Sequence, residues 1–370
     1  MKVLITGANS FVGKNLKLFL KERSDVEIFS FSKDDSISLL FDYVNKVDFV
    51  FHLAGVNRSS DPKEFISGNE ILTQKLSDAV KKTTRKIPII YTSSIQAKLD
   101  TPYGISKRNA ENILLNLNED FKIPVYIFRL PNIFGKWSKP NYNSVVSTFC
   151  YNITRDIPIH INNSKDLLNL VYIDDVIKQF IKIMNEKKNM QTKDFKFVNP
   201  LYQITIGDLA KQLYAFKEMR NSNILERVGT GLVGALYSTY TSYLPQQKFS
   251  YPVKAHNDLR GRFVEILKTQ DSGQFSYFTV LPNISRGEHY HHSKTEKFLV
   301  IKGNARFKFY HLDTAETYEL IVNGDKPEIV ESIPGWAHNI KNIGNDEMVV
   351  MIWANENFDP FNPDTFSYQV

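Results

Sequence analysis

Residues 2–13 read KVLITGANSFVG, and this stretch decides the fold of the first half of the chain. KVLIT is an uninterrupted apolar run rich in β-branched residues, as in a buried strand, and VGKNLKLFLKER (12–23) has helical periodicity. GANSFVG lies between them, where the backbone must turn tightly. A strand, a glycine turn and a helix in this order predict a dinucleotide site, with the pyrophosphate at the helix N-terminus.

The glycines of this turn have separate expected roles. Gly7 supplies the turn, and Gly13 allows the helix to pack closely on the strand. A GxxGxxG pattern would have a third glycine where this chain has Ser10, but serine fits most turns and its hydroxyl can bind a phosphate. We expect the cofactor to contact Gly7, Ser10, Phe11, Val12, Gly13, Lys33, Leu53, Ala54, Gly55, Tyr103 and Lys107.

The end of the second predicted strand bears on the choice between NAD and NADP. NAD-binding proteins usually place an acidic residue there for the ribose 2′-hydroxyl. Here the strand ends FSFSKDD (29–35), so that Ser32 and Lys33 come before the acids Asp34 and Asp35. A hydroxyl and a cation suit a 2′-phosphate, which favours NADP(H). The alternative is that Lys33 is a solvated surface lysine.

Further along, apolar runs continue to alternate with helical patterns up to about residue 215. The runs lie at 26–32, 48–55, 86–94 and 124–130. This rhythm predicts a Rossmann-type α/β fold, a doubly wound parallel sheet with helices on both faces.

One segment of this half has the residues of a proton donor. Tyr103 and Lys107 in TSSIQAKLDTPYGISKRNAE (92–111) are four positions apart and share one face of a helix. A lysine ammonium favours the phenolate and is expected to lower the pKa of the tyrosine. Ser94, which ends the preceding strand, can hydrogen-bond a substrate carbonyl. Together these three residues predict proton donation to a ketone that receives a hydride.

With HLAG (52–55), RLPNIFG (129–135) and YIDDV (172–176), residues 1–215 resemble the extended short-chain dehydrogenase/reductase family. The resemblance implies NAD(P) chemistry at C4 of a nucleotide-activated sugar, as an epimerase, a dehydratase or a reductase. Dehydratases of this family usually place acidic residues directly after the catalytic serine. This chain has Ile95–Ala97 there, which argues against dehydration.

After about residue 250 the pattern changes to short strand-like runs separated by Gly, Asn, Asp and Pro. Such a pattern predicts an all-β jelly roll or small antiparallel barrel. We therefore expect two domains, 1–245 and 246–370. The predicted strands lie at 274–282, 296–303, 304–312, 316–324, 328–335 and 347–355.

Histidines gather in HYHHSKTEKFLVIKG (289–303). In an extended strand His289 and His291 point to one face while His292 points away. Glu296 follows where the chain can bend back, and His338 would join from a distant strand. Imidazoles with a carboxylate suit Zn²⁺, Fe²⁺, Mn²⁺ or Ni²⁺. We predict a metal site of His289, His291, Glu296 and His338, with zinc as the expected ion.

The spacing of these residues is similar to that of the cupins, H-x-H-x4-E-x6-G followed by G-x2-H-x3-N in GWAHNIKN (335–342). HNDLRGRFVEILKT (256–269) also resembles the opening of the deoxysugar 3,5-epimerases, which are cupins that remove a proton beside a 4-ketone. In those families an arginine helps to hold the nucleotide phosphates. Arg260 stands at the matching position.

The order of a reductase followed by a cupin resembles the bifunctional enzymes of capsular polysaccharide synthesis. The resemblance implies C3 epimerisation of UDP-2-acetamido-2,6-dideoxy-hexos-4-ulose by the cupin, then C4 reduction with NADPH. The product would be UDP-2-acetamido-2,6-dideoxy-L-talose, a precursor of N-acetyl-L-fucosamine. Two alternatives are a single-activity 4-epimerase or reductase with a structural cupin, and a sugar-nucleotide sensor without catalysis.

Composition narrows the setting of this activity. The chain has 370 residues, a net charge of +6 and one cysteine, Cys150. Long Lys/Arg runs and long uncharged apolar runs are both missing from the sequence, so we expect neither nucleic-acid binding nor a membrane span. A single cysteine that cannot form an internal disulfide favours the cytoplasm. The aromatic segment between the two halves and the cupin predict a homodimer or a larger homo-oligomer.

Overall fold

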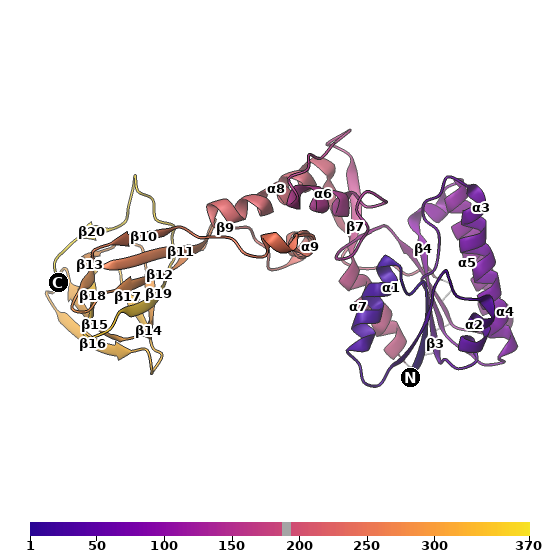
Figure 1. The fold of residues 1–370 in the computed structure, drawn as a ribbon, viewed down its shortest axis with the longest axis horizontal. Coiled ribbons are helices and arrows are strands. Elements are labelled where there is room, and N and C mark those ends of the chain that lie inside the picture. Colours follow the sequence, from indigo (N-terminus) through magenta and orange to yellow (C-terminus); the bar gives the residue numbers. More distant parts are fainter. Residues whose placement is uncertain (187–193) are drawn as a thin grey trace. The chain divides into compact units, whose positions relative to one another are not determined.

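The structure, a computed structural model, describes residues 1–186 and 194–370 (Figure 1). The chain divides into two compact units. The α/β unit comprises 1–213 and 234–244, and the β unit comprises 214–233 and 245–370. Within the described residues, no helix combines the length and the apolar character that a membrane span needs.

The α/β unit is built on a five-stranded sheet in the order β2-β1-β3-β4-β5, in which every neighbouring pair is parallel. The predicted doubly wound parallel sheet is therefore confirmed. The strand order reverses between β1 and β3, and such a switch point opens a crevice at the carboxyl ends of the strands. The strands are β1 (Lys2–Thr6), β2 (Glu27–Phe31), β3 (Phe49–His52), β4 (Ile89–Ser94) and β5 (Val125–Leu130).

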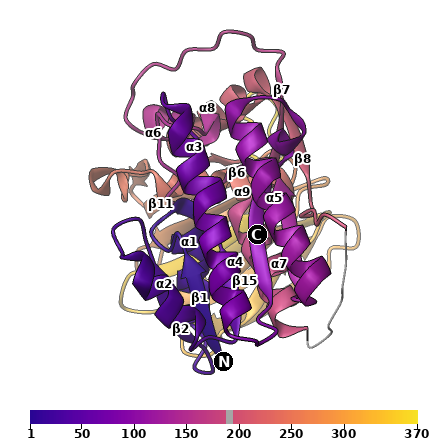
Figure 2. The same ribbon diagram turned by 90° about the vertical axis from the view of Figure 1, so that its right-hand side faces the viewer.

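Helices cover both faces of this sheet because successive strand residues point to opposite sides. Ile5 belongs to the core shared with α1 (Phe11–Lys21) and α7 (Ile173–Asn185). Leu4, its neighbour, belongs to the core on the other face. That second face is covered by α2 (Ile37–Val44), α4 (Leu72–Lys82) and α5 (Pro102–Phe121) (Figure 2).

Smaller elements complete the α/β unit. A three-stranded sheet in the order β6-β7-β8 pairs β6 with β7 in parallel and β7 with β8 in antiparallel fashion. These elements are α3 (Pro62–Phe65), the π-helical turn η1 (Ile66–Ile71), the 3₁₀ turn η2 (Ile95–Lys98), β6 (Asn132–Phe134), α6 (Val145–Thr154), β7 (Leu167–Tyr172), β8 (Tyr202–Thr205), α8 (Ile206–Ser222) and α9 (Gly231–Ser242), of which α8 and α9 extend into the β unit's residues.

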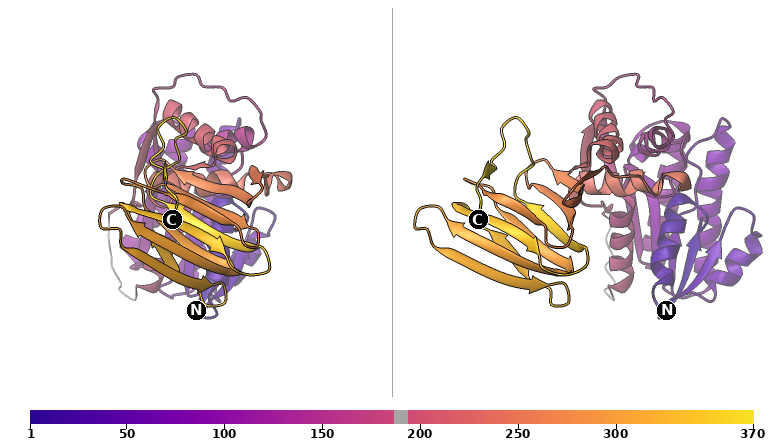
Figure 3. Two further views of the ribbon diagram at one scale, coloured as in Figure 1. Left: turned by 90° about the vertical axis from the view of Figure 1, so that its left-hand side faces the viewer. Right: turned by 60° about the vertical axis from the view of Figure 1, so that its left-hand side comes forward.

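The β unit consists of two antiparallel sheets, with the orders β10-β11-β12-β19-β14-β17 and β16-β15-β18-β13-β20 (Figure 3). Phe278 and Phe298 from one sheet and Phe307 and Ile340 from the other meet in a shared core, which confirms the expected all-β second half. The strands are β10 (Ala255–Asp258), β11 (Gly261–Thr269), β12 (Gln274–Val280), β13 (Ser285–Tyr290), β14 (Glu296–Lys302), β15 (Asn304–His311), β16 (Thr317–Asn323), β17 (Ile329–Ser332), β18 (Trp336–Asn342), β19 (Met348–Ala354) and β20 (Phe366–Ser367).

The β unit also contains a segment that lies earlier in the sequence than its other strands. β9 (Ile224–Leu225) pairs in parallel with the end of β11, and Lys268 N donates to Asn223 O at 2.7 Å. Residues 214–233 therefore group with the β unit, whereas the sequence pattern predicted that they belong to domain 1–245. The prediction differs because β9 and β11 are some 40 residues apart in the sequence, and no local pattern indicates that they pair.

Candidate functional site

The glycine-rich turn connects β1 to α1. Gly7 has φ +69°, and a Cβ there would lie 2.7 Å from Ala54 N. A Cβ on Gly13 would lie 2.2 Å from Gly7 O, so a side chain at either position would push the turn apart. Ser10 caps α1 by accepting a hydrogen bond from Gly13 N at 3.1 Å. Its hydroxyl hydrogen can still be donated to a phosphate oxygen. The turn fits the dinucleotide site predicted from the sequence.

A further glycine, Gly55, lies in the segment that follows β3. The preceding Ala54 N donates to Thr6 Oγ1 at 3.3 Å, which ties the segment to β1. A Cβ on Gly55 would lie 2.7 Å from Asn69 Oδ1 and 3.1 Å from Lys107 Nζ. The segment around Gly55 therefore lies against both β1 and the Lys107 side chain of helix α5.

Lys33 follows β2 and is exposed. The acid expected to come too late for a ribose hydroxyl, Asp35, folds back on the chain. Its carboxylate accepts from Ser32 N at 2.7 Å and from Ser32 Oγ at 2.9 Å. Asp35 is thus engaged in its own turn, which leaves Lys33 and Asp34 as the exposed charged side chains after the strand.

Tyr103 and Lys107 lie on α5, as their spacing predicted. The helix begins here because Thr101 accepts from Gly104 N and Pro102 occupies the first turn. Lys107 is buried, and its Nζ donates to Thr92 O at 2.9 Å and to Tyr91 Oη at 3.3 Å. Burial lowers the pKa of Lys107 to about 8.

The Tyr103 phenol interacts with the side chain of Ser94, the residue that ends β4. Burial raises the pKa of Tyr103, although the interaction with Ser94 acts in the opposite direction. The expectation that Lys107 lowers this pKa is therefore wrong for the chain without cofactor, because the Lys107 ammonium is directed at Thr92 and Tyr91 instead. A phenol that stays neutral is the form that can donate a proton to a ketone.

Sequence reasoning missed Asn69, which lies in the π-helical turn η1 and is buried. Its Oδ1 accepts from Val56 N at 3.0 Å, and its Nδ2 donates to Val56 O at 3.0 Å and to Ser106 Oγ at 2.9 Å. Asn69 therefore ties the segment after Gly55 to helix α5. No spacing in the sequence indicates this contact.

Two further buried groups in this unit have their polar atoms bonded within the chain. His52 is hydrogen-bonded at both ring nitrogens, to Thr6 Oγ1 at 2.7 Å and to Thr73 Oγ1 at 2.8 Å, and burial lowers its pKa to about 3. Glu111, one turn after Lys107, is held by two hydrogen bonds from Arg129 at 2.9 and 2.7 Å. HLAG and RLPNIFG thus each contribute a side chain, His52 and Arg129, to buried hydrogen bonds of this unit.

The comparisons with known proteins divide the chain in the same two parts. Residues 3–198 match the NAD dependent epimerase/dehydratase family, which is more than half of the chain. The chain belongs to this family. Residues 256–366 match a second description, the polysaccharide biosynthesis C-terminal domain.

Among members of the family, the UDP-2-acetamido-2,6-beta-L-arabino-hexul-4-ose reductase of Pseudomonas aeruginosa is 58% identical over 370 residues, 100% of this chain and 99% of that protein. The capsular polysaccharide assembling protein CapF from Staphylococcus aureus has the same fold over 100% of both chains, with a TM-score of 0.93 and 42% identity. The UDP-glucuronic acid 4-epimerase from Bacillus cereus covers 66% of this chain and 96% of its own, with a TM-score of 0.56 and 19% identity. This last likeness concerns the fold alone.

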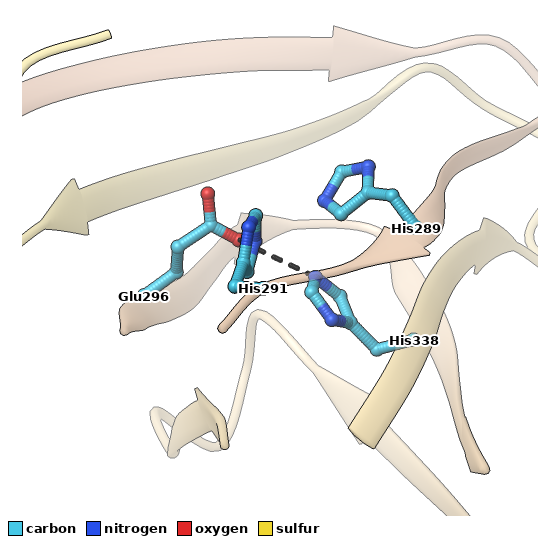
Figure 4. A group of neighbouring side chains, drawn as sticks. All are labelled: His289, His291, Glu296 and His338. Carbon is cyan, nitrogen blue, oxygen red and sulfur yellow. Dashed lines mark ion pairs between the residues drawn. The ribbon is translucent and has the colours of Figure 1, made fainter. Parts of the chain in front are cut away.

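In this family member the four predicted metal ligands come together in the β unit. Their ligand atoms all lie within 4.8 Å of one another, and Figure 4 shows the four side chains directed at a common point. His289 on β13 is the register partner of His338 on β18, and Glu296 begins β14. The centroids of the His289 and His291 rings are 4.9 Å apart, so these two rings converge as expected.

Four ring nitrogens of this cluster are buried without a hydrogen bond to any described residue. They are His289 Nε2, His291 Nε2 and both ring nitrogens of His338. The Nε2 atoms of His291 and His338 each lie 3.3 Å from Glu296 Oε2, outside directed hydrogen-bonding geometry. Burial lowers the pKa of His289 to about 4, so its ring is neutral and offers a lone pair. Three imidazoles and one carboxylate are a donor set that fits a divalent metal such as zinc.

The remaining residues singled out in the β unit lie away from this point. His292 packs against Tyr290 and Phe366, as expected of a side chain that points away. His256 is exposed on β10, and His311 Nδ1 accepts from the backbone of the following turn at 3.2 and 3.0 Å. Arg260 forms an ion pair with Asp258 at 2.6 Å, and Arg286 lies 3.4 Å from the same carboxylate.

Proposed function

We propose that the chain inverts C3 of UDP-2-acetamido-2,6-dideoxy-hexos-4-ulose in its β unit and then reduces the C4 ketone with NADPH in its α/β unit. The observation that carries the proposal is the arrangement of Ser94, Tyr103 and Lys107 beside the glycine turn. The resulting UDP-2-acetamido-2,6-dideoxy-L-talose would serve surface polysaccharide synthesis as a precursor of N-acetyl-L-fucosamine.

The reduction needs a proton donor that points at the carbonyl oxygen. A bound NADPH supplies the hydride, which goes to C4 of the sugar. Tyr103 gives its phenolic proton to the oxygen that becomes the C4 hydroxyl, and Ser94 holds the same oxygen by a hydrogen bond. The raised pKa of Tyr103 keeps the phenol protonated for this step.

The cofactor would bind at the edge of the sheet between β1 and β3. Gly7 and Gly13 leave room for the pyrophosphate, and the N-terminus of α1 faces it. Lys107 would hold the ribose hydroxyls, and Lys33 would pair with a 2′-phosphate. A Lys33→Glu variant should therefore bind NADPH about tenfold more weakly while NADH binding is retained, since one charge contact of about 1.4 kcal/mol is worth a factor of ten.

Epimerisation needs a ketone at C4, because the carbonyl makes the neighbouring C3–H acidic. A base of the β unit would take this proton, and a proton returned to the other face of C3 would invert the centre. We propose that His289, His291, Glu296 and His338 hold a divalent metal, with zinc as the expected ion. The metal would either polarise an oxygen of the substrate or hold the site together as a structural ion.

The similarity to known proteins supports this proposal along the whole chain. The Pseudomonas aeruginosa relative is a reductase of a UDP-linked 4-keto sugar, and the match covers 100% of this chain and 99% of that protein. Epimerisation is reversible and nearly thermoneutral, so that reduction in the same chain would draw the sequence of reactions forward. This gives a physical reason for the two units to be joined.

The test is incubation of the UDP-linked 4-keto-6-deoxy amino sugar in D₂O, with and without NADPH, followed by NMR. We expect deuterium at C3 without NADPH and an inverted, reduced product with NADPH. Reduction without exchange at C3 would leave a single-activity reductase whose β unit is structural. Lack of any turnover with this class of sugar would contradict the enzymatic assignment.

A further inference from the structure

Residues 364–370, called here the strap, run alongside the metal cluster of the β unit. Part of the strap is β20, which pairs with β13 in antiparallel fashion. Ser367 is the register partner of His289, and Phe366 is the partner of Tyr290. The strap is thus an edge strand added to the strand that carries the first histidine of the cluster.

The strap also determines which nitrogen of His291 is free. The backbone oxygen of Asp364 lies 2.5 Å from His291 Nδ1. A carbonyl oxygen only accepts hydrogen bonds, so Nδ1 carries the hydrogen and the lone pair of the neutral ring is on Nε2. His291 Nε2 is the atom directed at Glu296 and the cluster. Outer contacts of this kind fix the tautomer and the orientation of metal-binding histidines.

The side chain of Asp364 holds the turn between two of the ligands. Its carboxylate accepts from the backbone nitrogens of His292, Ser293 and Lys294, each at 2.8 Å, and from Ser293 Oγ at 2.9 Å. These three residues, with Thr295, connect His291 to Glu296. One carboxylate therefore fixes the backbone from which both ligands project.

The far end of the strap holds the backbone beside the other two ligands. Glu288, which precedes His289, has φ +58° and accepts from Tyr368 N and Val370 N, each at 2.8 Å. Asn339, which follows His338, donates from Nδ2 to Glu288 Oε1 at 2.8 Å and to Val370 O at 3.3 Å. The contacts of the strap thus reach the immediate neighbours of the three histidines and Lys294, which lies two positions before Glu296.

We infer that the strap is a positioning element of the metal centre and that Asp364 is its principal residue. Without the Asp364 carboxylate, the 292–294 turn loses four hydrogen bonds, and His291 and Glu296 are no longer held at metal-binding separation. This inference rests on the proposed metal site, but not on the sugar chemistry proposed for it.

The experiment measures the affinity of the full chain for Zn²⁺ by competition with a chromogenic chelator. Asp364→Asn keeps the size of the side chain and removes its charge, and we expect zinc affinity to fall by about 10- to 100-fold. Ser293→Ala, which deletes one of the four hydrogen bonds, should give a smaller loss. Asp359→Asn is the matched control, because it makes the same charge change nearby and, among the described residues, the Asp359 carboxylate bonds only to Phe361 N in its own turn. Its zinc affinity should not change.

Thermal unfolding of the metal-free proteins separates positioning from general stability. The lost hydrogen bonds should lower the unfolding temperature of metal-free Asp364→Asn slightly, but the variant should stay folded at the temperature of the zinc titration. Unchanged zinc affinity would overturn the role of the strap, and so would a loss of affinity that is matched by unfolding of the metal-free variant. Failure of the wild type to take up zinc would instead overturn the proposed metal centre, and the inference with it.

Discussion

The two candidate sites differ in how their buried polar groups are satisfied. In the α/β unit His52 is bonded at both ring nitrogens, all three polar bonds of Asn69 are made within the chain, and the Lys107 ammonium has two acceptors. In the β unit four ring nitrogens of the cluster are buried without hydrogen bonds. A buried polar group without a partner costs about 1–3 kcal/mol, a cost that the proposed metal would remove from the β site, whereas the buried polar groups named in the α/β unit are already paired.

The two sites therefore differ in how their side chains are held in position. The α/β site is preorganised by hydrogen bonds between β1, β3, η1 and α5, and its open part is the glycine-lined edge. The β site brings four donor side chains together, and hydrogen bonds from Asp364 hold the turn that connects two of them. Substitutions in one site, with measurements on both, test whether the two sites act independently.

The largest expected effect is on the reduction. Tyr103→Phe removes the proton donor and should lower the rate of C4 reduction by about 10²- to 10⁴-fold, as is typical for loss of a general acid. Zinc content should not change. Steady-state oxidation of NADPH measures the rate, and Tyr43→Phe is the matched control, because Tyr43 packs against Phe29 and lies outside the site. Reduction at the wild-type rate would contradict the role of Tyr103.

The second effect concerns the β unit alone. His338→Ala removes a ligand and should weaken zinc binding by more than the roughly 100-fold that outer contacts can cost. NADPH affinity should stay at the wild-type value. Elemental analysis and a fluorescence titration with NADPH measure the two quantities. His311→Ala is the control on the same unit, and a zinc content in His338→Ala equal to that of the control would exclude His338 as a ligand.

The third effect is structural and concerns the turn of the α/β unit. Gly13→Ala places a methyl group 2.2 Å from Gly7 O, and overpacking of this kind costs about 1–3 kcal/mol in the free energy of unfolding. The displaced turn should also weaken NADPH binding. Chemical denaturation and calorimetric titration measure these changes. Gly229→Ala is the control, since a Cβ there meets no atom within 4 Å. Equal stability of the two variants would show that the close packing is not needed.

The smallest effect is a pH dependence. The pKa of Lys107 is lowered by burial to about 8, and Glu111 on the same helix opposes this shift. The other titratable groups that face Lys107 are the phenol of Tyr91 and the neutral ring of His52. Because the ammonium form binds the ribose, the NADPH Kd should rise as pH increases through about 8.

This rise should be at most tenfold per pH unit, because one proton is linked to binding. Lys107→Met has no group to titrate there and should bind NADPH weakly at every pH. Titrations of both proteins between pH 7 and 9 test the assignment. A wild-type Kd that is constant over this range would show that Lys107 is not the ribose contact.

The sequence predicted those parts of both sites that depend on short-range pattern. Gly7, Gly13, the helical pair Tyr103 and Lys107, and the histidine spacing each follow from turn or strand geometry over a few residues. Asn69 and Asp364 were missed because their contacts join segments that no local period connects. The pKa of Tyr103 was predicted wrongly because burial cannot be judged from a neighbouring lysine in the sequence. Preference for NADPH, zinc as the metal and the homodimer stay predictions.

The central claim is that the two units carry out separate steps on one substrate, and a crossed test of two variants examines it most directly. In D₂O, Tyr103→Phe should exchange C3 of the 4-keto sugar without reducing C4, His338→Ala should not exchange C3, and a mixture of the two should again form the inverted, reduced product. Loss of C3 exchange in Tyr103→Phe, or no recovery of product in the mixture, would contradict the account.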